Sequence, residues 1–596
     1  MKFNSRTVLP RVVLAILIFI GWYLPAVADL IPATRLPAGG KWTPGIPGGI
    51  PTTGYTEWCN VKVSIPGSPL KAIGDGIADD TLAIQTAINL CPPNGIIRIP
   101  EGTYRVTTTI TVAGQCGQPL RPMILRGDGP TKTKILSYAT SGNLMDIVQC
   151  KGPAAGTVHL MGSTPGSFRG QSNFPAVWLH PMLGGNANNL SGAVGNWVLL
   201  NHFDLGSYWS QFSKVVRYAT NTITIWPPLY SASTSTTLPV DISYVDTAAF
   251  RTGVEDLYIE QKVNHGGNGF FMKGAVECWL KNVESVGVYN WHVRLEMSTA
   301  CEVRDSYFHD THWPGSGGGN SAYGVGIRVP GSHHLIENNI FRWLRHSMLI
   351  EGGSGNVFGY NYSFNTINEG QAGTDYLMHD AVTHGLAAQY NLFEGNIAQR
   401  LNYDNAEWWE GLGGYCNTAY RNWFQRMPLN AQSSGGMTAM ANQWQNYSNN
   451  IIGNIALTPW RTDTQGYFSD QPRNIIFGVM ELDWWKDSVM VPTGNPDQMA
   501  IYNQMPKTSN SVIYALNYDF ATKTNCCGVP PTDPLPNSYY LSTKPAWFGS
   551  LPWPAYGPDV AVKTNSIPAL ARYNGIPVGT NSSVRPAPPP KPRVVE

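Results

Sequence analysis

The sequence predicts an all-β protein that folds as a single-stranded right-handed parallel β-helix with an N-terminal capping helix. Two observations carry this prediction: a composition poor in charge and rich in turn residues, and a short motif that recurs at the spacing of one coil. Only 13% of the 596 residues are charged, whereas glycine and proline number 62 and 45. Such a balance leaves little material for charged surface helices and much for tight turns. A solenoid also accommodates the length, because each coil contacts only its neighbours.

The recurring motif is an apolar residue, one intervening residue and then Asn or Asp. Its Asn and Asp positions are Asp256, Asn282, Asp305, Asn338, Asn361, Asn396, Asn422 and Asn454. The shorter intervals fit one coil, and the longer ones fit a coil with an insertion of roughly ten residues. Because Asn and Asp tolerate left-handed corners, we expect a hydrogen-bonded ladder between coils about 4.8 Å apart. The ladder residues are therefore expected to be structural.

One helix is predicted near the N-terminus. Ile84, Ala87 and Ile88 recur at helical spacing behind an acidic start, which predicts an amphipathic helix of about three turns. A turn follows at residues 94–95, and residues 96–106 are typical of a strand, a corner and a second strand.

Residues 74–106 contain the stretch GDGIADDTLAIQTAIN followed by NGIIRIPEGTYRV. This stretch resembles the N-terminal signature of the rhamnogalacturonase/epimerase-like pectate lyase superfamily, whose members have the pectin lyase-like right-handed parallel β-helix. The resemblance implies that the helix caps the open end of the solenoid, with Asp75, Asp79 and Asp80 as turn and cap residues. It implies little about chemistry, because hydrolases, lyases, epimerases and phage tailspikes share this opening.

The chain divides into four predicted segments. Basic residues precede an apolar run and a small-residue cleavage motif at residues 26–28, so we expect a signal peptide and a secreted, extracellular or periplasmic protein. An uncleaved anchor is the alternative, although the run is shorter than the roughly 20 residues that span a bilayer. The segments are a signal peptide (1–28), an extended arm (29–70), the β-helix with cap and C-terminal closure (71–560) and a Pro-rich, disordered tail (561–596). Within the closure, residues 540–549 are expected to cover open sheet edges.

Nine cysteines in an exported chain predict some disulfides and an odd thiol. Four of them could staple the cap: Cys59, Cys91, Cys116 and Cys150. Cys278 and Cys301 each lie four residues before a motif position, so we expect them to stack on neighbouring coils. Both a disulfide and a pair of free thiols are compatible with that spacing.

The formal net charge of +1 gives no field that favours nucleic acid or an anionic membrane. A neutral or weakly charged partner fits better, and exposed members of the 20 Trp could stack on sugars. We therefore expect an extracellular polysaccharide as partner, with no nucleic acid and no membrane after signal cleavage. No cofactor and no metal are predicted, because the sequence shows neither an ordered calcium motif nor zinc spacing.

Insertions between coils often collect on one side of a solenoid and wall a groove, so the longest intervals locate the predicted site. Seven of the 12 histidines fall within residues 309–384. The predicted catalytic residues are Asp380, Glu410, His384, Asp404, Glu407 and Arg400. The predicted substrate-binding residues are Trp408, Trp409, His309, Asp310, Trp313 and His379.

Two chemistries fit these residues. Glycoside hydrolysis needs two carboxyl groups, for which Asp380 and Glu410 are the best pair, with His384 nearby. Elimination from a uronic acid needs a base and cations that neutralise the carboxylate. Arg400 with Arg426, or His379 with His384, could supply them. The polygalacturonase-like pattern of the superfamily, Asn-x-Asp with a paired Asp-Asp and Gly-His-Gly, is not recognisable, which puts pectin in doubt as substrate.

A third possibility is non-catalytic. A secreted β-helix can bind glycan as an adhesin or as a component of a surface layer, and the exposed aromatic residues that would grip a sugar serve this role equally well.

Overall fold

The computed structural model describes most of residues 30–578. The residues outside the described part are 1–29, 114–120, 149–156, 161–172, 180–193, 196, 205–206, 220–221, 231–239, 245–248, 313–320, 367–378, 386–387, 405–413, 426–439, 443–445, 447, 457–476, 480–512, 516, 520–523, 527–534, 564 and 579–596. The signal peptide expected at 1–28 falls outside, as do Cys116 and Cys150. No helix in the described part is long and apolar enough to cross a membrane.

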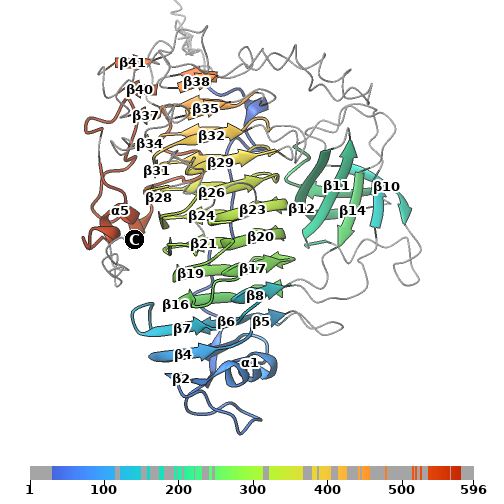
Figure 1. Cartoon of the computed structure of the whole chain (residues 1–596). Helices are drawn as coiled ribbons and strands as arrows, with labels where there is room; N and C mark the ends of the chain where they lie inside the picture. Colours follow the sequence, from blue (N-terminus) through green and yellow to red (C-terminus); the bar gives the residue numbers. More distant parts are fainter. Residues whose placement is uncertain are drawn as a thin grey trace, which may run out of the picture.

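Parallel strands stack along one axis in three long sheets (Figure 1). Sheet I comprises β5 (Ile110–Ala113), β8 (Met145–Val148), β17 (Phe270–Lys273), β20 (Trp291–Thr299), β23 (Tyr323–Ser332), β26 (His346–Glu351), β29 (Ala381–His384), β32 (Leu401–Asp404), β35 (Met440–Asn442) and β38 (Phe477–Val479). Sheet II comprises β1 (Thr56–Asn60), β3 (Gly95–Arg98), β6 (Met123–Arg126), β16 (Gly253–Gln261), β19 (Trp279–Val286), β21 (Glu302–Arg304), β24 (Leu335–Glu337), β27 (Val357–Gly359), β30 (Leu392–Glu394), β33 (Thr418–Tyr420), β36 (Asn450–Ile452) and β39 (Ile513–Ala515). Sheet III comprises β2 (Asp75–Asp79), β4 (Gly102–Val106), β7 (Thr133–Ser137), the second halves of β16 and β19, β22 (Tyr307–His309), β25 (Ile340–Arg342), β28 (Tyr362–Phe364), β31 (Ile397–Ala398), β34 (Trp423–Phe424), β37 (Ile455–Ala456) and β40 (Asn517–Asp519). The short strands β15 (Ala249–Phe250) and β18 (Ala275–Val276) extend sheet I, and β41 (Thr524–Cys526) pairs antiparallel with β40.

Each coil visits sheets II, III and I in turn, and each strand pairs in parallel with its equivalent one coil later. Thus β24 pairs with β27, β25 with β28 and β26 with β29. Alternation along the strands directs register-matched residues such as Ile336, Phe358 and Phe393 into the main core. The predicted fold class, a right-handed parallel β-helix, is confirmed.

Buried asparagines form a ladder at the corner between sheets II and III. The Asn339 side chain donates to Asn361 Oδ1 at 3.1 Å, and the Asn361 side chain donates to Asn396 Oδ1 at 3.0 Å. The contacts continue coil by coil through Asn422, Asn454 and Asn517. Because the backbone N–H of each residue also donates to the next Oδ1, for example Asn361 N to Asn396 at 3.0 Å, the ladder fixes the register of the coils.

The predicted ladder mixed two adjacent columns. Its first four members, Asp256, Asn282, Asp305 and Asn338, precede the buried column by one residue and have positive φ values of 52° to 59°. Their side chains bond in pairs, such as Asn338 Nδ2 to Asp305 Oδ1 at 2.8 Å, and not as a continuous ladder. The motif therefore marked the left-handed corner in the lower coils and the buried ladder in the upper ones.

A second column lies at the corner between sheets I and II and explains the two cysteines. It runs through Cys278, Cys301, His334, Asn356, Asn391, Asn417 and Asn449. Cys278 and Cys301 stack on neighbouring coils as predicted, because Trp279 pairs with Glu302 in the next register position. Both are buried free thiols, and so are Cys59 and Cys91.

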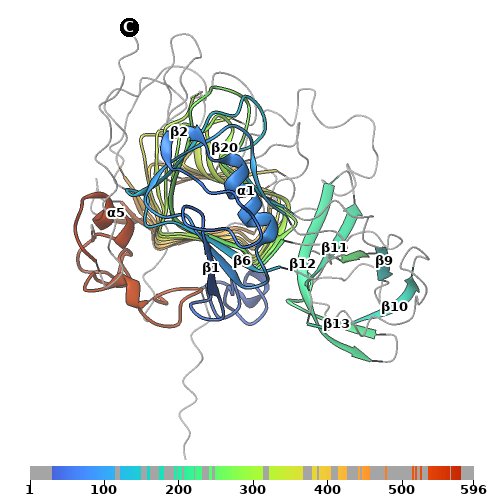
Figure 2. The same ribbon diagram turned by 90° about the horizontal axis from the view of Figure 1, so that it is seen from below.

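The predicted amphipathic helix is α1 (Thr81–Leu90), which lies across the end of the coils in Figure 2. Ile84, Ala87 and Ile88 are at most 1% exposed and belong to the main core cluster. Asp80, at the N-cap position, accepts the Ile73 N–H at 2.6 Å and the Gly74 N–H at 3.0 Å, so its carboxylate holds the preceding turn.

A closed barrel of six antiparallel strands interrupts the solenoid and stands beside it (Figures 1 and 2). Its strands are β9 (Thr157–Leu160), β10 (Asn173–Leu179), β11 (Trp197–Asp204), β12 (Ser207–Ala219), β13 (Thr222–Trp226) and β14 (Val240–Tyr244). The sequence predictions do not include this barrel, because its residues carry no motif at coil spacing.

The barrel packs on the corner between sheets I and II. Tyr230 stacks on Tyr390 with ring centroids 4.8 Å apart, and His333 Nε2 lies 2.9 Å from the Phe212 carbonyl oxygen. Burial lowers the pKa of His333 to about 4, so a neutral ring donates this bond at pH 7. Aromatic contacts therefore attach the barrel to the side of the coils.

Two terminal segments cover the outer faces of sheets II and III. The N-terminal arm, residues 30–55, contains η1 (Ala33–Arg35) and buries Trp42 beside Leu335 of sheet II. The C-terminal segment, residues 535–578, contains η4 (Ala546–Phe548) and α5 (Pro568–Tyr573) and packs on sheet III, for example on Ile340.

The C-terminal segment corrects two predictions. Residues 540–549 lie over the sheet faces, not over the sheet edges, because Phe548 belongs to one apolar cluster with the outward sheet III residues Ile340 and Tyr362. The predicted disordered tail begins at residue 561, yet α5 falls within it. Its proline start and its buried Ala569 give this stretch an apolar surface to pack.

We predict that Ile84→Asp destabilises the protein by about 3–5 kcal/mol, because an unpaired charge would face the core. The yield of folded protein and the melting temperature should both fall. Leu82→Asp is the matched control, since Leu82 is 64% exposed on the same helix and should behave as wild type. Wild-type yield and melting for Ile84→Asp would show that α1 does not cover the solenoid.

Asn396→Ala should destabilise the protein by about 3 kcal/mol, because the N–H groups of Asn361 would lose their acceptor inside the protein. The measurement is the melting temperature. Asn89→Ala, at an exposed position of α1, is the control and should leave it unchanged. Equal melting temperatures for the two variants would contradict a structural role of the ladder.

Candidate functional site

The outer face of sheet I carries the candidate site, where β29 and β32 lie on neighbouring coils. His384 pairs with Asp404 in the strand register, and His384 Nδ1 lies 2.7 Å from Asp404 Oδ2. Their side chains are 34% and 22% exposed. The structure thus brings together two predicted catalytic residues within reach of solvent. A carboxylate in this position orients the imidazole for proton transfer.

These two residues continue a column of charged side chains on successive coils. In register order the charged column is Lys273, Glu296, Arg328, Glu351, His384 and Asp404. Lys273 Nζ lies 3.0 Å from Glu296 Oε1, and Arg328 Nε lies 3.3 Å from Glu351 Oε2. Acidic and basic side chains therefore alternate from coil to coil along the outer face of sheet I.

Two cations hold Glu296 ionised. Its burial disfavours the charged form, but hydrogen bonds and charge from Lys273 and Arg294 outweigh this effect and lower the pKa of Glu296 below its usual value. Arg294 Nη2 approaches Glu296 Oε2 at 2.5 Å from the neighbouring outward position. The lower end of the charged column is therefore a set of ion pairs, whereas at its upper end His384 and Asp404 are bonded to each other.

An apolar patch lies beside the charged column on the same face of sheet I. It contains Trp291, Tyr323, Leu349 and Val382. Tyr323 meets Trp291 edge to face at 4.9 Å, and the Arg345 guanidinium lies 5.7 Å from the Tyr323 ring centroid. The four residues are buried, with Trp291 at 0% and Tyr323 at 6% exposure, so this patch is a packed support beside the charged column.

Asp380 lies inside the solenoid, not on its surface. It is 0% exposed, and Oδ1 accepts bonds from the Ser363 and Thr366 hydroxyls. Oδ2 accepts the backbone N–H groups of Gln399 and Arg400, each at 2.9 Å. These four donors make Asp380 a tie between coils, which corrects its expected place in a solvent-facing carboxylate pair.

Two further predicted residues support this region from within. Arg400 is 3% exposed, and its backbone N–H belongs to the Asp380 tie. His379 is half-buried, and its carbonyl oxygen accepts a bond from His346 Nδ1 at 2.7 Å. Burial, together with the Arg400 charge, holds the pKa of His379 well below its usual value, so this ring is neutral at pH 7.

His309 and Asp310 lie on sheet III, so the predicted cluster is divided between two faces. His309 is bonded to two carboxylates, with Nδ1 3.0 Å from Asp310 Oδ2 and Nε2 3.1 Å from Glu284 Oε1. Burial opposes the charged ring, but the bonds to both carboxylates raise the pKa of His309 above its usual value. The arrangement is an internal ion pair, and Asp310 is its exposed end.

The remaining predicted residues lie outside the described part of the chain: Glu407, Trp408, Trp409, Glu410, Trp313 and Arg426. Their assignment stays a prediction.

The sequence predictions missed the lower part of the charged column, including Glu351 and Arg328. A usable signal was present, because several strands of sheet I end with an outward charge directly after a core residue, as in Met272–Lys273 and Ile350–Glu351. Finding it required the strands of sheet I to be aligned, and the motif belongs to a different corner of the coil. Within the described residues, no group of three or more His, Cys, Asp or Glu side chains could hold a metal ion.

No protein-family model and no curated protein matches the chain. Among solved structures, the tailspike protein gp49 from Pseudomonas phage LKA1 is similar, with 16% identity, a TM-score of 0.47, and coverage of 65% of this chain and 62% of that chain. The A-module of mannuronan C-5 epimerase AlgE4 from Azotobacter vinelandii matches at 11% identity and a TM-score of 0.30, covering 67% and 88%. PfbA, a surface adhesin of Streptococcus pneumoniae, matches at 15% identity and a TM-score of 0.29, covering 65% and 87%.

The match to gp49 spans less than two thirds of the tailspike's own length. The parallel β-helix of this chain is established by its own strand pairing.

Asp380→Asn should lower stability by about 3 kcal/mol, because the amide would point a donor at other donors in a buried site. Asp404→Asn should cost at most about 1 kcal/mol, since Asp404 is partly exposed. Melting temperatures of the two variants decide between the roles. A wild-type melting temperature for Asp380→Asn would contradict its assignment as a tie between coils.

Proposed function

We propose that this protein is exported and that it binds and cleaves an extracellular polysaccharide along the outer face of sheet I. The observation that carries the proposal is the partly exposed His384–Asp404 pair, 2.7 Å apart, with Glu351 one coil away on the same column. Acid–base chemistry requires ionisable groups that a substrate can reach; His384 and Asp404 meet this requirement, whereas Glu351 is 3% exposed and lies beneath them at the edge of the accessible part.

For hydrolysis, this face would supply a general base and a general acid. One group must activate water and another must protonate the leaving oxygen, and Glu351 and His384 lie on neighbouring coils, about 4.8 Å apart along the solenoid axis. Glu351, whose Oε2 lies 3.3 Å from Arg328 Nε, activates water. His384, oriented by Asp404, protonates the leaving oxygen.

The same groups could perform β-elimination on a uronic acid. His384 would then take the proton beside the carboxylate, and Arg328 would neutralise the substrate charge. Products separate the two reactions across a panel of polysaccharides. Hydrolysis yields new reducing ends alone, elimination also yields unsaturated ends that absorb in the ultraviolet, and binding without either product would favour the non-catalytic, adhesin-like role.

His384→Gln, Asp404→Asn and Glu351→Gln should each lower turnover by roughly 100-fold or more, because proton transfer is lost with little change in volume. Melting temperatures should show that each variant folds. Glu260→Gln, which removes an ion-paired carboxylate on sheet III, should keep full activity. Folded variants of the three residues with full activity would remove the charged column from the mechanism.

A further inference from the structure

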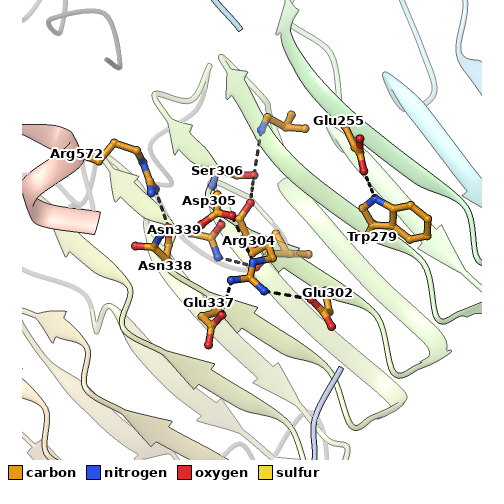
Figure 3. A network of polar contacts seen from close by, with 12 residues as sticks. Glu255, Trp279, Glu302, Arg304, Asp305, Ser306, Glu337, Asn338, Asn339 and Arg572 are labelled. Carbon is orange, nitrogen blue, oxygen red and sulfur yellow. Dashed lines mark hydrogen bonds and ion pairs between the residues drawn. The ribbon is translucent and has the colours of Figure 1, made fainter. Parts of the chain in front are cut away.

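Three carboxylates share one guanidinium on the outer side of sheet II (Figure 3). Arg304 Nη2 lies 2.8 Å from Glu337, its Nε lies 3.3 Å from Asp305, and its Nη1 lies 3.6 Å from Glu302. Glu302 and Glu337 are each 2% exposed. Like charges this close in a desolvated site cannot all remain ionised without a large cost. The cluster therefore favours a state in which one of its three carboxyl groups is protonated.

Each of two carboxylates in this cluster holds a different terminal segment. Glu302 Oε1 accepts the Ile46 N–H of the N-terminal arm at 3.0 Å. Glu337 Oε1 is bonded to the Tyr540 hydroxyl of the C-terminal segment at 2.8 Å. Arg572 also ties that segment to the corner, because its Nη2 donates to the Asn338 carbonyl oxygen at 2.6 Å (Figure 3). The charges thus lie where the solenoid meets both ends of the chain.

A fourth carboxylate repeats the contact two coils further on. Glu394 follows Glu337 and Gly359 in the strand register and is 0% exposed. Its Oε2 accepts the Tyr539 N–H at 2.9 Å. A Cβ at Gly359 would lie 2.3 Å from the Tyr540 hydroxyl oxygen. Glycine therefore makes room for a phenol between two buried glutamates.

Burial raises the pKa of Glu337 to about 7 and that of Glu394 to about 7. The groups that face Glu337 are Arg304, Tyr540, Glu302 and Asp305. The groups that face Glu394 are Ser538, Tyr539, Tyr360 and Arg421. The nearby cations and donors thus offset only part of the desolvation. A phenol hydroxyl can donate or accept, so the Tyr540 bond itself tolerates either protonation state, and the pH dependence of docking comes from the cost of burying the ionised carboxylates under the segment.

We propose that Glu337 and Glu394 form a proton-dependent clamp, which binds residues 538–540 of the C-terminal segment to sheet II when protonated and loosens when they ionise. The direction of the pH dependence follows from proton linkage. Both pKa values in the docked state lie above the ordinary 4.5, so docking is strongest below 4.5 and weakens as the pH rises toward 7. The clamp lies on sheet II, apart from the charged column of sheet I.

Hydrogen–deuterium exchange of peptides that cover residues 538–541 tests the clamp, with each rate divided by its intrinsic rate at the same pH. Between pH 5 and pH 8 the wild-type protection factor should fall by about tenfold or more, with most of the loss complete near pH 7. The double variant Glu337→Gln, Glu394→Gln mimics the neutral acids and should keep its protection at pH 8.

Glu57→Gln is the matched control, because Glu57 lies on sheet II with its side chain 53% exposed; it should reproduce the wild-type fall. Protection that is constant from pH 5 to pH 8 in wild type overturns the clamp. So does a double variant, folded by its melting curve at pH 5, that loses protection as wild type does. If the double variant does not fold, each single variant should retain part of the protection at pH 8, and a full wild-type loss in both again overturns it.

Discussion

The register between coils is the constraint on which the rest of the molecule depends. Side chains of a strand alternate between core and surface, so a slip of one residue would turn every outward charge inward. Two columns of buried amides exclude such a slip, one on each side of sheet II. Asn361 and Asn391, for example, each present one oxygen that accepts both a backbone and a side-chain N–H from the preceding coil. These two columns therefore also determine which side chains lie next to one another on the outer faces of the sheets.

The three sheets each have an outer face, and these faces differ in which segments of the chain pack on them. The N-terminal arm and the C-terminal segment cover much of sheets II and III with apolar residues such as Trp42 and Phe548. The barrel attaches at the corner of sheet I through Tyr230. On sheet I a charged column runs along the outer face, and its upper end, His384 and Asp404, is partly exposed. The proposed site was placed there for this reason.

The fold could be predicted because it depends on short repeats in the sequence. Composition, the helix signature and the corner motif each depend on residues that are close in sequence, and all three indicated a parallel β-helix. The site was less accessible, since the direction of a side chain depends on the exact register of its coil. Asp380 follows an insertion, and no local pattern shows that Ser363 and Thr366 turn it inward. The barrel was missed for a related reason: antiparallel strands of irregular spacing leave no repeat to count.

The carboxylates also show why a perturbed pKa does not by itself locate chemistry in this protein. Burial raises the pKa of Asp380, Glu337 and Glu394, and raised values of this kind often mark active sites. Here each of the three is enclosed by donors from its own chain, so a substrate would have to displace a native contact to reach it. Access separates the two kinds of acid. The side chain of Asp404 is 22% exposed. Asp380, Glu337 and Glu394 instead join segments of the fold. Proton binding at Glu337 and Glu394 is therefore coupled to the docking of the C-terminal segment and not to a reaction.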